Sequence, residues 1–323
     1  MNDFMQQTNR ECSQRLKDFL NESKSLAYFI GSGVSIGNYP DWAGIPSKMK
    51  EIYTANGWTW LEDDQWLQIT KENPQKLQEL FEEIKNLNTE HYINSLKEIF
   101  DAEPINHKDY LLQIIKSNPR LLVTLNFDIS IQAAYTLLDK HHALDARVFP
   151  YSTHLSPERE NSSVLMHLHG KYHDKLLGNP DHIVLHKSGY DYAYNHDPKP
   201  LRSLLKTLFL DHDVVFIGTG MTEPEMVEFL RALTDRVQEG GIKRRRIALL
   251  PTSVIPDNQS APREISSEQE YQMEKSADRS RFAQLGIECL RFFPLGPNFR
   301  GLHEIITEAL GSNSRPELAE ISW

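Results

Sequence analysis

The sequence predicts an α/β protein with a Rossmann-like, doubly wound parallel sheet and a helical insert or subdomain. Short apolar runs of strand length recur along the chain, with helical patterns between several of them. Strands that alternate with helices in this way form parallel sheets. The first apolar run, Leu26–Ile30, leads directly into the glycine-rich turn Gly31–Gly37. A strand followed by such a turn is the first phosphate-binding element of nucleotide-binding folds.

A short helix is expected before this strand, because Cys12, Leu16, Phe19 and Leu20 share one helical face. Further apolar runs of strand length follow the first, and helical patterns cover residues 200–210 and 223–237. The expected strands span residues 121–125, 164–168, 183–185, 214–217, 247–250 and 287–292.

A long helical stretch of about residues 46–117 separates the glycine turn from the second strand. Its clearest helical face consists of Leu77, Leu80, Phe81, Ile84 and Leu87. We expect an all-helical insert beside the sheet. The whole fold is expected to occupy residues 1–311, with residues 312–323 as a tail.

Charge and cysteine content narrow the class of protein. The formal net charge of −10 disfavours direct nucleic-acid binding, which requires a concentrated positive surface. The basic run Lys243–Arg246 fits a solvated loop before a strand. Cys12 and Cys289 are the only cysteines, so a cysteine-based zinc site is excluded and a reduced compartment is expected. Since no signal core or bilayer-length apolar segment occurs, cytoplasmic localisation is the expectation.

Three more polar or glycine-rich motifs stand at the ends of expected strands, where ligands of open α/β sheets bind. They are Thr124–Asp128, His167–Gly170 and Phe216–Gly220. Each motif has a structural alternative when taken alone: Asn126 or Asp128 could cap a helix, His169 could be a core histidine, and the glycines could form turns. Four such motifs at four strand ends favour a ligand site.

Together the segments FIGSGVS, TLNFD, HLHG and FIGTGMTEPEM resemble the sirtuin-like domains of bacterial anti-phage defence proteins. The motif order agrees, and the resemblance covers about residues 25–295. The segment Tyr39–Trp42 resembles the stretch after the sirtuin glycine turn, although Ala43 stands where an arginine is usual. Residues 183–185, with Tyr190, resemble another element of the defence-type domains.

The resemblance implies NAD as the ligand and assigns roles to individual residues. Phosphates would lie along the glycine turn, the adenosine end near the last motif, and the nicotinamide ribose near Asn126 and Asp128, with His169 as the catalytic histidine. The expected cofactor contacts are Gly31, Ser32, Gly33, Ser35, Asp41, Trp42, Thr124, Gly218, Thr219 and Gly220.

One departure from the family bears on the reaction. Deacylating sirtuins carry a four-cysteine zinc ribbon, which this chain lacks. Water therefore becomes the expected acceptor, and the expected activity is NAD glycohydrolase. The expected catalytic residues are Asn126, which holds ribose and water, His169 as base, and Asp128, which orients or electrostatically supports the ribosyl cation. A non-catalytic NAD or ADP-ribose sensor and an NAD-dependent deacylase or ADP-ribosyltransferase remain alternatives.

The remaining expectations concern metal ions and protein partners. Histidines are plentiful between His167 and His196, with Asp174 and Asp181 nearby, but no HExxH spacing occurs and no metal is expected. An uncontrolled NAD hydrolase would poison its own cell. We therefore expect a homo-oligomer, a separate regulatory or sensor protein, or both.

Overall fold

The computed structural model describes residues 3–61, 74–159, 162–172, 176, 178–197, 199–221, 223–237, 244–253, 267–295 and 299–311. Within these residues, seven strands form one sheet in the order β3-β4-β2-β1-β5-β6-β7. The strands are β1 (Leu26–Ile30), β2 (Leu121–Thr124), β3 (Leu144–Val148), β4 (Ser163–His167), β5 (Asp213–Ile217), β6 (Arg246–Pro251) and β7 (Glu288–Phe292).

The strand order confirms the predicted fold class. If β3 is set aside, the remaining strands follow the order 3-2-1-4-5-6 of dinucleotide-binding folds. Strand β3 extends the edge next to β4 and pairs with it in parallel, as β2 also does on the other side of β4. Strands β5, β6 and β7 pair in parallel as well.

The chain divides into two compact units. The first unit contains Met1–Phe29, Lys108–Arg120 and Phe209–Trp323, and the second contains Ile30–His107 and Leu121–Leu208. Helix α9 (Pro200–Asp211) begins in the second unit and ends in the first.

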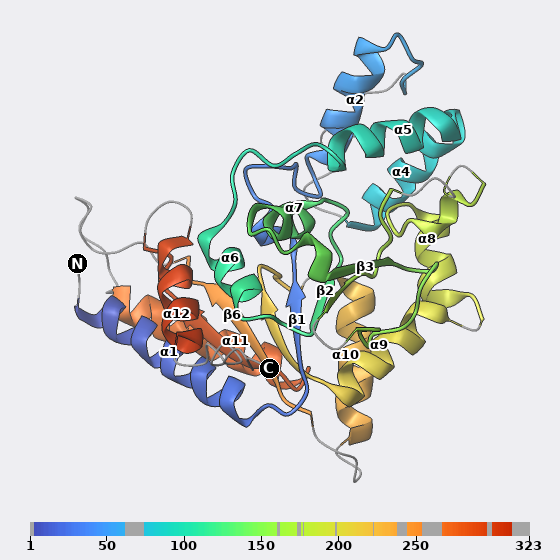
Figure 1. Cartoon of the computed structure of the whole chain (residues 1–323). Helices are drawn as coiled ribbons and strands as arrows, with labels where there is room; N and C mark the ends of the chain where they lie inside the picture. Colours follow the sequence, from blue (N-terminus) through green and yellow to red (C-terminus); the bar gives the residue numbers. More distant parts are fainter. Residues whose placement is uncertain are drawn as a thin grey trace, which may run out of the picture. The chain divides into compact units, whose positions relative to one another are not determined.

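In the first unit, α1 packs against α12 and β7, and α6 packs against α12 (Figure 1). The predicted N-terminal helix is confirmed, since Cys12, Leu16, Phe19 and Leu20 are all buried on α1. The helices of this unit are α1 (Asp3–Glu22), α6 (Asp109–Lys116), α10 (Pro224–Val237), α11 (Ser267–Ala283) and α12 (Arg300–Leu310).

In the second unit, α5 (Thr89–Phe100) contacts both α2 (Ile45–Ala55) and α4 (Pro74–Leu87), as Figure 1 shows. These helices share a hydrophobic core. On the predicted face of α4, the first four residues are buried, whereas Leu87 is 43% exposed. The unit also contains α7 (Ser130–Leu137), α8 (Lys187–Tyr190) and the π-helix Asp191–Asn195.

The structure differs from the predicted strands in two places. Residues 183–185 form no strand; they lie in a turn before α8 and are completely buried, which explains their apolar character. Strand β3 was not predicted, because Asp145 and Arg147 interrupt its apolar residues. The predicted helical stretch 46–117 also spans both units, since α6 belongs to the first unit and α2, α4 and α5 to the second.

Both cysteines, Cys12 and Cys289, lie in the first unit and form no disulfide. The Cys12 thiol donates to the Arg291 carbonyl over 3.1 Å, and burial raises its pKa to about 12. Burial, followed by the charge of Asp278, also raises the pKa of Cys289 to about 12.

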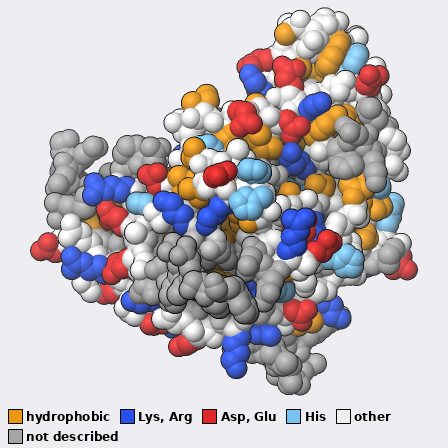
Figure 2. All heavy atoms as spheres, in the orientation of Figure 1, with side chains coloured by type: hydrophobic (Ala, Val, Ile, Leu, Met, Phe, Trp, Pro, Cys, Tyr) orange, Lys and Arg blue, Asp and Glu red, His pale blue; other side chains and the backbone are white. Residues whose placement is uncertain are grey.

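The surface mixes charges of both signs. Among the described side chains on the face drawn in Figure 2, lysine and arginine are interspersed with aspartate and glutamate. None of the described helices combines the length and apolar content that a bilayer crossing requires. The predicted tail 312–323, together with Trp66, His173, Asp174 and Lys243, lies outside the described residues.

Candidate active site

The glycine turn follows β1 and begins with a short 3-10 helix, Ser32–Val34. Gly31 is buried, whereas Ser32 is exposed and Gly33 is half-buried. The turn closes at Gly37, whose φ of +89° lies in the left-handed region that glycine adopts without strain. The predicted phosphate-binding turn therefore combines exposed and buried positions.

The end of β2 is tied to this turn through Thr124 and Asn126. The Thr124 hydroxyl donates to the Ile30 carbonyl over 2.7 Å and accepts from the Asn126 backbone N–H over 3.0 Å. The Asn126 amide nitrogen donates to the Gly31 carbonyl over 3.1 Å and contacts the Ser35 hydroxyl at 3.3 Å. Thr124 is fully buried and Asn126 is half-buried. Thr124 thus orients Asn126, whose amide lies at the turn.

Asp128 joins the same group from the start of α7. Its Oδ2 accepts from the Ser35 hydroxyl over 2.7 Å, and its Oδ1 accepts from the Ser130 backbone N–H over 2.9 Å. The Ser35 hydroxyl also lies 3.2 Å from that of Ser130. Both oxygens of this buried carboxylate therefore hold the glycine turn and the backbone just before α7, whose N-cap residue is Ile129.

His167, the last residue of β4, supports Asn126 from behind. Its Nδ1 lies 2.9 Å from the Asn126 carbonyl oxygen, and its Nε2 lies 2.8 Å from the Gln132 side-chain nitrogen. Since a carbonyl oxygen can only accept, Nδ1 carries the proton and Nε2 accepts. Burial lowers the pKa of His167 to about 4, so the ring is neutral at pH 7. The sequence offered no signal for this supporting role.

His169 lies two residues beyond His167 and is only 3% exposed. Its Nε2 is 3.0 Å from the Tyr194 hydroxyl. The rings of Phe127, Tyr190 and Tyr194 surround it at centroid distances of 6.5, 5.7 and 6.0 Å. Hydrogen bonds thus link Asn126, Ser35 and Asp128 to one another. His169 lies next to the ring of Phe127, the residue between Asn126 and Asp128.

Asp41 and Trp42 have structural contacts. The Asp41 carboxylate accepts from the Gly44 backbone N–H over 2.8 Å. Trp42 packs edge-on against Phe81, at a centroid distance of 5.7 Å, beside the core of the helical region. Their predicted contacts with a cofactor remain predictions.

The last predicted motif follows β5 in the first unit. Gly218 has a φ of +69°, and Met221 has a φ of +49°. The Thr219 hydroxyl accepts from the Met221 backbone N–H over 3.3 Å, and Arg281 donates to the carbonyls of Gly220 and Met221. The loop is therefore a tight turn held by an arginine.

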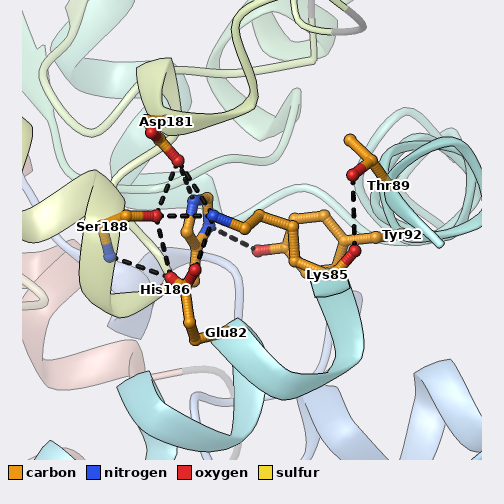
Figure 3. A network of polar contacts seen from close by, with 7 residues as sticks. All are labelled: Glu82, Lys85, Thr89, Tyr92, Asp181, His186 and Ser188. Atoms are coloured by element: carbon orange, nitrogen blue, oxygen red, sulfur yellow. Dashed lines mark hydrogen bonds and ion pairs between the residues drawn. The ribbon is translucent and has the colours of Figure 1, made fainter. Parts of the chain in front are cut away.

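A second polar network, drawn in Figure 3, joins α4 and α5 to the segment around α8. Lys85 is 7% exposed, yet its ammonium pairs with Glu82 at 2.7 Å and Asp181 at 3.0 Å. The Ser188 hydroxyl lies 2.6 Å from the Lys85 Nζ. The sequence predicted none of these contacts, because Lys85 and Glu82 look like solvated helix positions.

His186 is completely buried in this network. Its Nε2 lies 3.1 Å from Asp181 Oδ1, and its Nδ1 lies 3.0 Å from the Tyr92 hydroxyl. The hydrogen bond from His186 is the main reason why the pKa of Asp181 falls well below its ordinary value. The carboxylate therefore accepts from Nε2–H, while Nδ1 accepts from Tyr92. Within the described residues, no group of three or more histidine, cysteine or carboxylate side chains is arranged to hold a metal ion.

Strand order and motif positions define a Rossmann-like α/β protein with polar groups gathered beyond β1 and β2. Comparison with known proteins makes the class more specific. The model of the SIR2-like domain family matches residues 120–276. Defense-associated sirtuin 2 of Bacillus subtilis is 26% identical over 222 residues, which cover 65% of this chain. The matched part is 19% of that protein's length, so this chain spans about a fifth of it.

A solved structure described under the words "Structural Basis for the Mechanism and Regulation of Sir2 Enzymes" aligns with 94% of this chain and 99% of its own. Its identity is 12% and its TM-score is 0.41. The family match and the Bacillus subtilis relative confirm the resemblance to sirtuin-like domains that the four motifs predicted.

Proposed function

We propose that this chain binds NAD along the glycine turn and cleaves the bond between nicotinamide and ribose. The observation that carries the proposal is the position of the Asn126 amide, which touches both Gly31 and Ser35 of the turn. A ribose held at this amide would place its attached diphosphate along the backbone N–H groups of the turn, where anions bind. The match to the SIR2-like family supports the same ligand.

In the proposed reaction, the bond between the ribose C1′ and the pyridinium nitrogen breaks. Its electron pair remains on the nitrogen and neutralises the ring, so nicotinamide leaves without a general acid. The sugar passes through an oxocarbenium-like state, as in glycoside hydrolysis. Water then bonds to C1′ and gives its proton to a base, and the products are ADP-ribose and nicotinamide.

The chain's residues have distinct parts in this proposal. Asn126 holds the ribose and the attacking water, because an amide both donates and accepts. His169 accepts a proton from water or from a ribose hydroxyl. Asp128 acts through position, since its two oxygens hold Ser35 and Ser130.

The name of the Bacillus subtilis relative describes that protein as defence-associated and supports a proposal for the biological role of this chain. We propose that this chain is an effector of bacterial anti-phage defence, active in the cytoplasm, that depletes NAD when it is switched on. An oligomer or a separate regulatory protein would supply the switch, because continuous NAD hydrolysis would harm the host.

The test is to incubate the purified chain with NAD and measure nicotinamide and ADP-ribose over a range of protein concentrations. Loss of the His169 base is expected to lower turnover about 10²- to 10⁴-fold in His169→Ala. His142→Ala is the control, since His142 is an exposed histidine outside the site. Equal turnover in folded His169→Ala and wild type would remove His169 from the reaction.

The other activities give different products. If the chain is a sensor, it binds NAD but releases no nicotinamide at any protein concentration, either alone or with a candidate regulatory partner added. A deacylase or ADP-ribosyltransferase would release nicotinamide only with an acylated peptide or an acceptor protein present, and would modify that acceptor. Either result would replace the glycohydrolase proposal.

A further inference from the structure

Side chains hold both peptide groups that flank Asn126. Strand β2 ends at Thr124, which is in register with His167 of β4, so Asn126 lies beyond the paired residues. On one side, the Asn126 N–H donates to the Thr124 hydroxyl over 3.0 Å. On the other side, the Asn126 carbonyl oxygen accepts from His167 Nδ1 over 2.9 Å. These two contacts fix the direction in which the Asn126 side chain leaves the backbone.

That direction brings the Asn126 amide to the glycine turn. The amide nitrogen lies 3.1 Å from the Gly31 carbonyl oxygen and 3.3 Å from the Ser35 hydroxyl. Both distances are at the long end of ordinary hydrogen bonds, so these contacts restrain the amide weakly. The position of the amide therefore depends mainly on the restraints on its backbone.

The His167 ring is itself held at both nitrogens. His167 is 1% exposed, and its Nε2 lies 2.8 Å from the side-chain nitrogen of Gln132, a residue of α7. The ring thus joins the end of β4 to α7 and to the Asn126 backbone. A rotation of the ring away from the Asn126 carbonyl would break the contact with Gln132 as well.

We propose that His167 is a positioning residue for Asn126 in NAD cleavage. The inference rests on the proposed function, in which the Asn126 amide holds the ribose and the attacking water. This contact contributes most as the ribose becomes cationic, so it must keep its geometry in the transition state. Without the His167 contact, the peptide between Asn126 and Phe127 can rotate, and a shift of the amide by about 1 Å slows the chemical step.

Two amide substitutions at His167 test the inference as a matched pair. In His167→Asn, the amide nitrogen stands as many bonds from Cβ as Nδ1 does, so it can donate to the Asn126 carbonyl. In His167→Gln, the amide stands one bond further out and leaves the Nδ1 position without a donor. We expect kcat to fall about 10- to 100-fold in His167→Gln and much less in His167→Asn, with little change in the KM for NAD in either.

A packing role alone predicts the opposite order. Asn is smaller than Gln and leaves more of the buried space empty, so His167→Asn should then be the more damaged variant. Turnover is expressed per NAD-binding molecule, so that a lower folded fraction does not imitate a catalytic loss. A fall in kcat in His167→Asn that equals or exceeds the fall in His167→Gln would overturn the inference.

The second readout is the NMR signal of the Asn126 side-chain amide, in protein that contains isotope-labelled asparagine. The signal is assigned by its loss in Asn126→Asp. We expect it to shift and to exchange faster with solvent in His167→Gln, and to stay near the wild-type position in His167→Asn. Gln132→Met is a milder second variant, because Gln132 is half-buried, and should shift the signal and lower kcat in the same direction by less. An Asn126 signal that is unchanged in both His167→Gln and Gln132→Met would overturn the positioning role.

The two proposals fail in different ways. The amide signal is measured without NAD, so an unchanged signal overturns the positioning role even if wild type cleaves NAD. Absence of nicotinamide release from wild type, alone and with a candidate regulatory partner, overturns the proposed function and with it the catalytic purpose of the His167 contact.

Discussion

His167 donates a hydrogen bond from Nδ1 to the carbonyl oxygen of Asn126 over 2.9 Å. The contact crosses between two adjacent parallel strands, since Thr124 of β2 is in register with His167 of β4. It fixes the backbone of Asn126 from one side, while Thr124 fixes it from the other. Protonation of His167 would leave this Nδ1–H donor in place, but it would bury a positive charge and remove the Nε2 acceptor that faces the Gln132 side-chain nitrogen, so the site is sensitive to acid.

Acidification should therefore destabilise the protein through His167. Burial lowers its pKa from 6.5 to about 4 in the folded chain. Between pH 6.5 and about 4, the His167 side chain is protonated in the unfolded chain but largely neutral in the folded chain. The stabilisation is thus complete above pH 6.5 and is lost as the pH falls toward 4, by at most about 3 kcal/mol. Urea unfolding at several pH values in this window measures the loss.

His167→Gln provides the comparison, because an amide at this position does not titrate in this range. The variant should show a smaller fall in the free energy of unfolding between pH 6.5 and 4 than wild type. Burial also lowers the pKa of His186, so a residual slope is expected in the variant. Identical slopes in the two proteins would contradict the assignment to His167.

Asn126→Ala should affect turnover more than stability. The change removes the hydrogen bond to Gly31 and the contact with Ser35, so the free energy of unfolding should fall by about 1–2 kcal/mol. NAD affinity should change little, whereas nicotinamide release should fall strongly, because the lost contact matters most as the ribose becomes cationic. Calorimetry, NAD binding and product release on one preparation separate these effects. Full turnover in a destabilised variant would show that Asn126 only holds the turn.

Asp128→Ala should destabilise the glycine turn and the start of α7 together. It removes the acceptor for the Ser130 backbone N–H and leaves the buried Ser35 hydroxyl without this carboxylate, at a cost of about 1–3 kcal/mol. Asp128→Asn keeps an oxygen for the cap and an amide that can donate to Ser35. We expect it to retain most of the stability and the turnover. A large loss of turnover in stable Asp128→Asn would instead show that the negative charge takes part in the reaction.

Lys85→Met should be far more harmful than the loss of a surface lysine. It leaves Glu82 and Asp181 without their buried cation. Because the Asp181 side chain is 45% exposed, water compensates in part, and we expect a loss of about 2 kcal/mol. Lys48→Met is the control, since Lys48 and its partner Glu51 are exposed, and should change stability by less than about 0.5 kcal/mol. Equal melting temperatures for the two variants would contradict the role of the network.

Local patterns predicted most of the sheet and the group around the glycine turn. The meeting of Ser35, Asn126 and Asp128 follows from a general property of parallel sheets, whose strand ends share one edge. Residues 183–185 misled the prediction because full burial produces the same apolar run as a central strand. Residues 183–185 are buried because they belong to the turn that contacts the His169 backbone, and they do not pair as a strand.

The contacts that the sequence did not predict join residues that are distant along the chain. Lys85 and Asp181 are 96 positions apart, and nothing near either residue indicates an ion pair. The contact of His169 with Tyr194 was also not predicted, because Tyr194 follows it by 25 positions in a segment without regular periodicity. Such contacts depend on how helices and strands pack against one another, and the periodicity of a single segment carries no information about that packing.

The protonation state of the two thiols determines how the cysteines react with oxidants and alkylating agents. Thiolates, not thiols, react with peroxides and alkylating agents, and burial raises the pKa of Cys12 and Cys289 to about 12. Since the sequence contains no other cysteine, thiol-selective reagents find almost no thiolate on this chain at neutral pH. A cysteine introduced at an exposed position would therefore accept a fluorophore or spin label selectively, without prior removal of the native thiols.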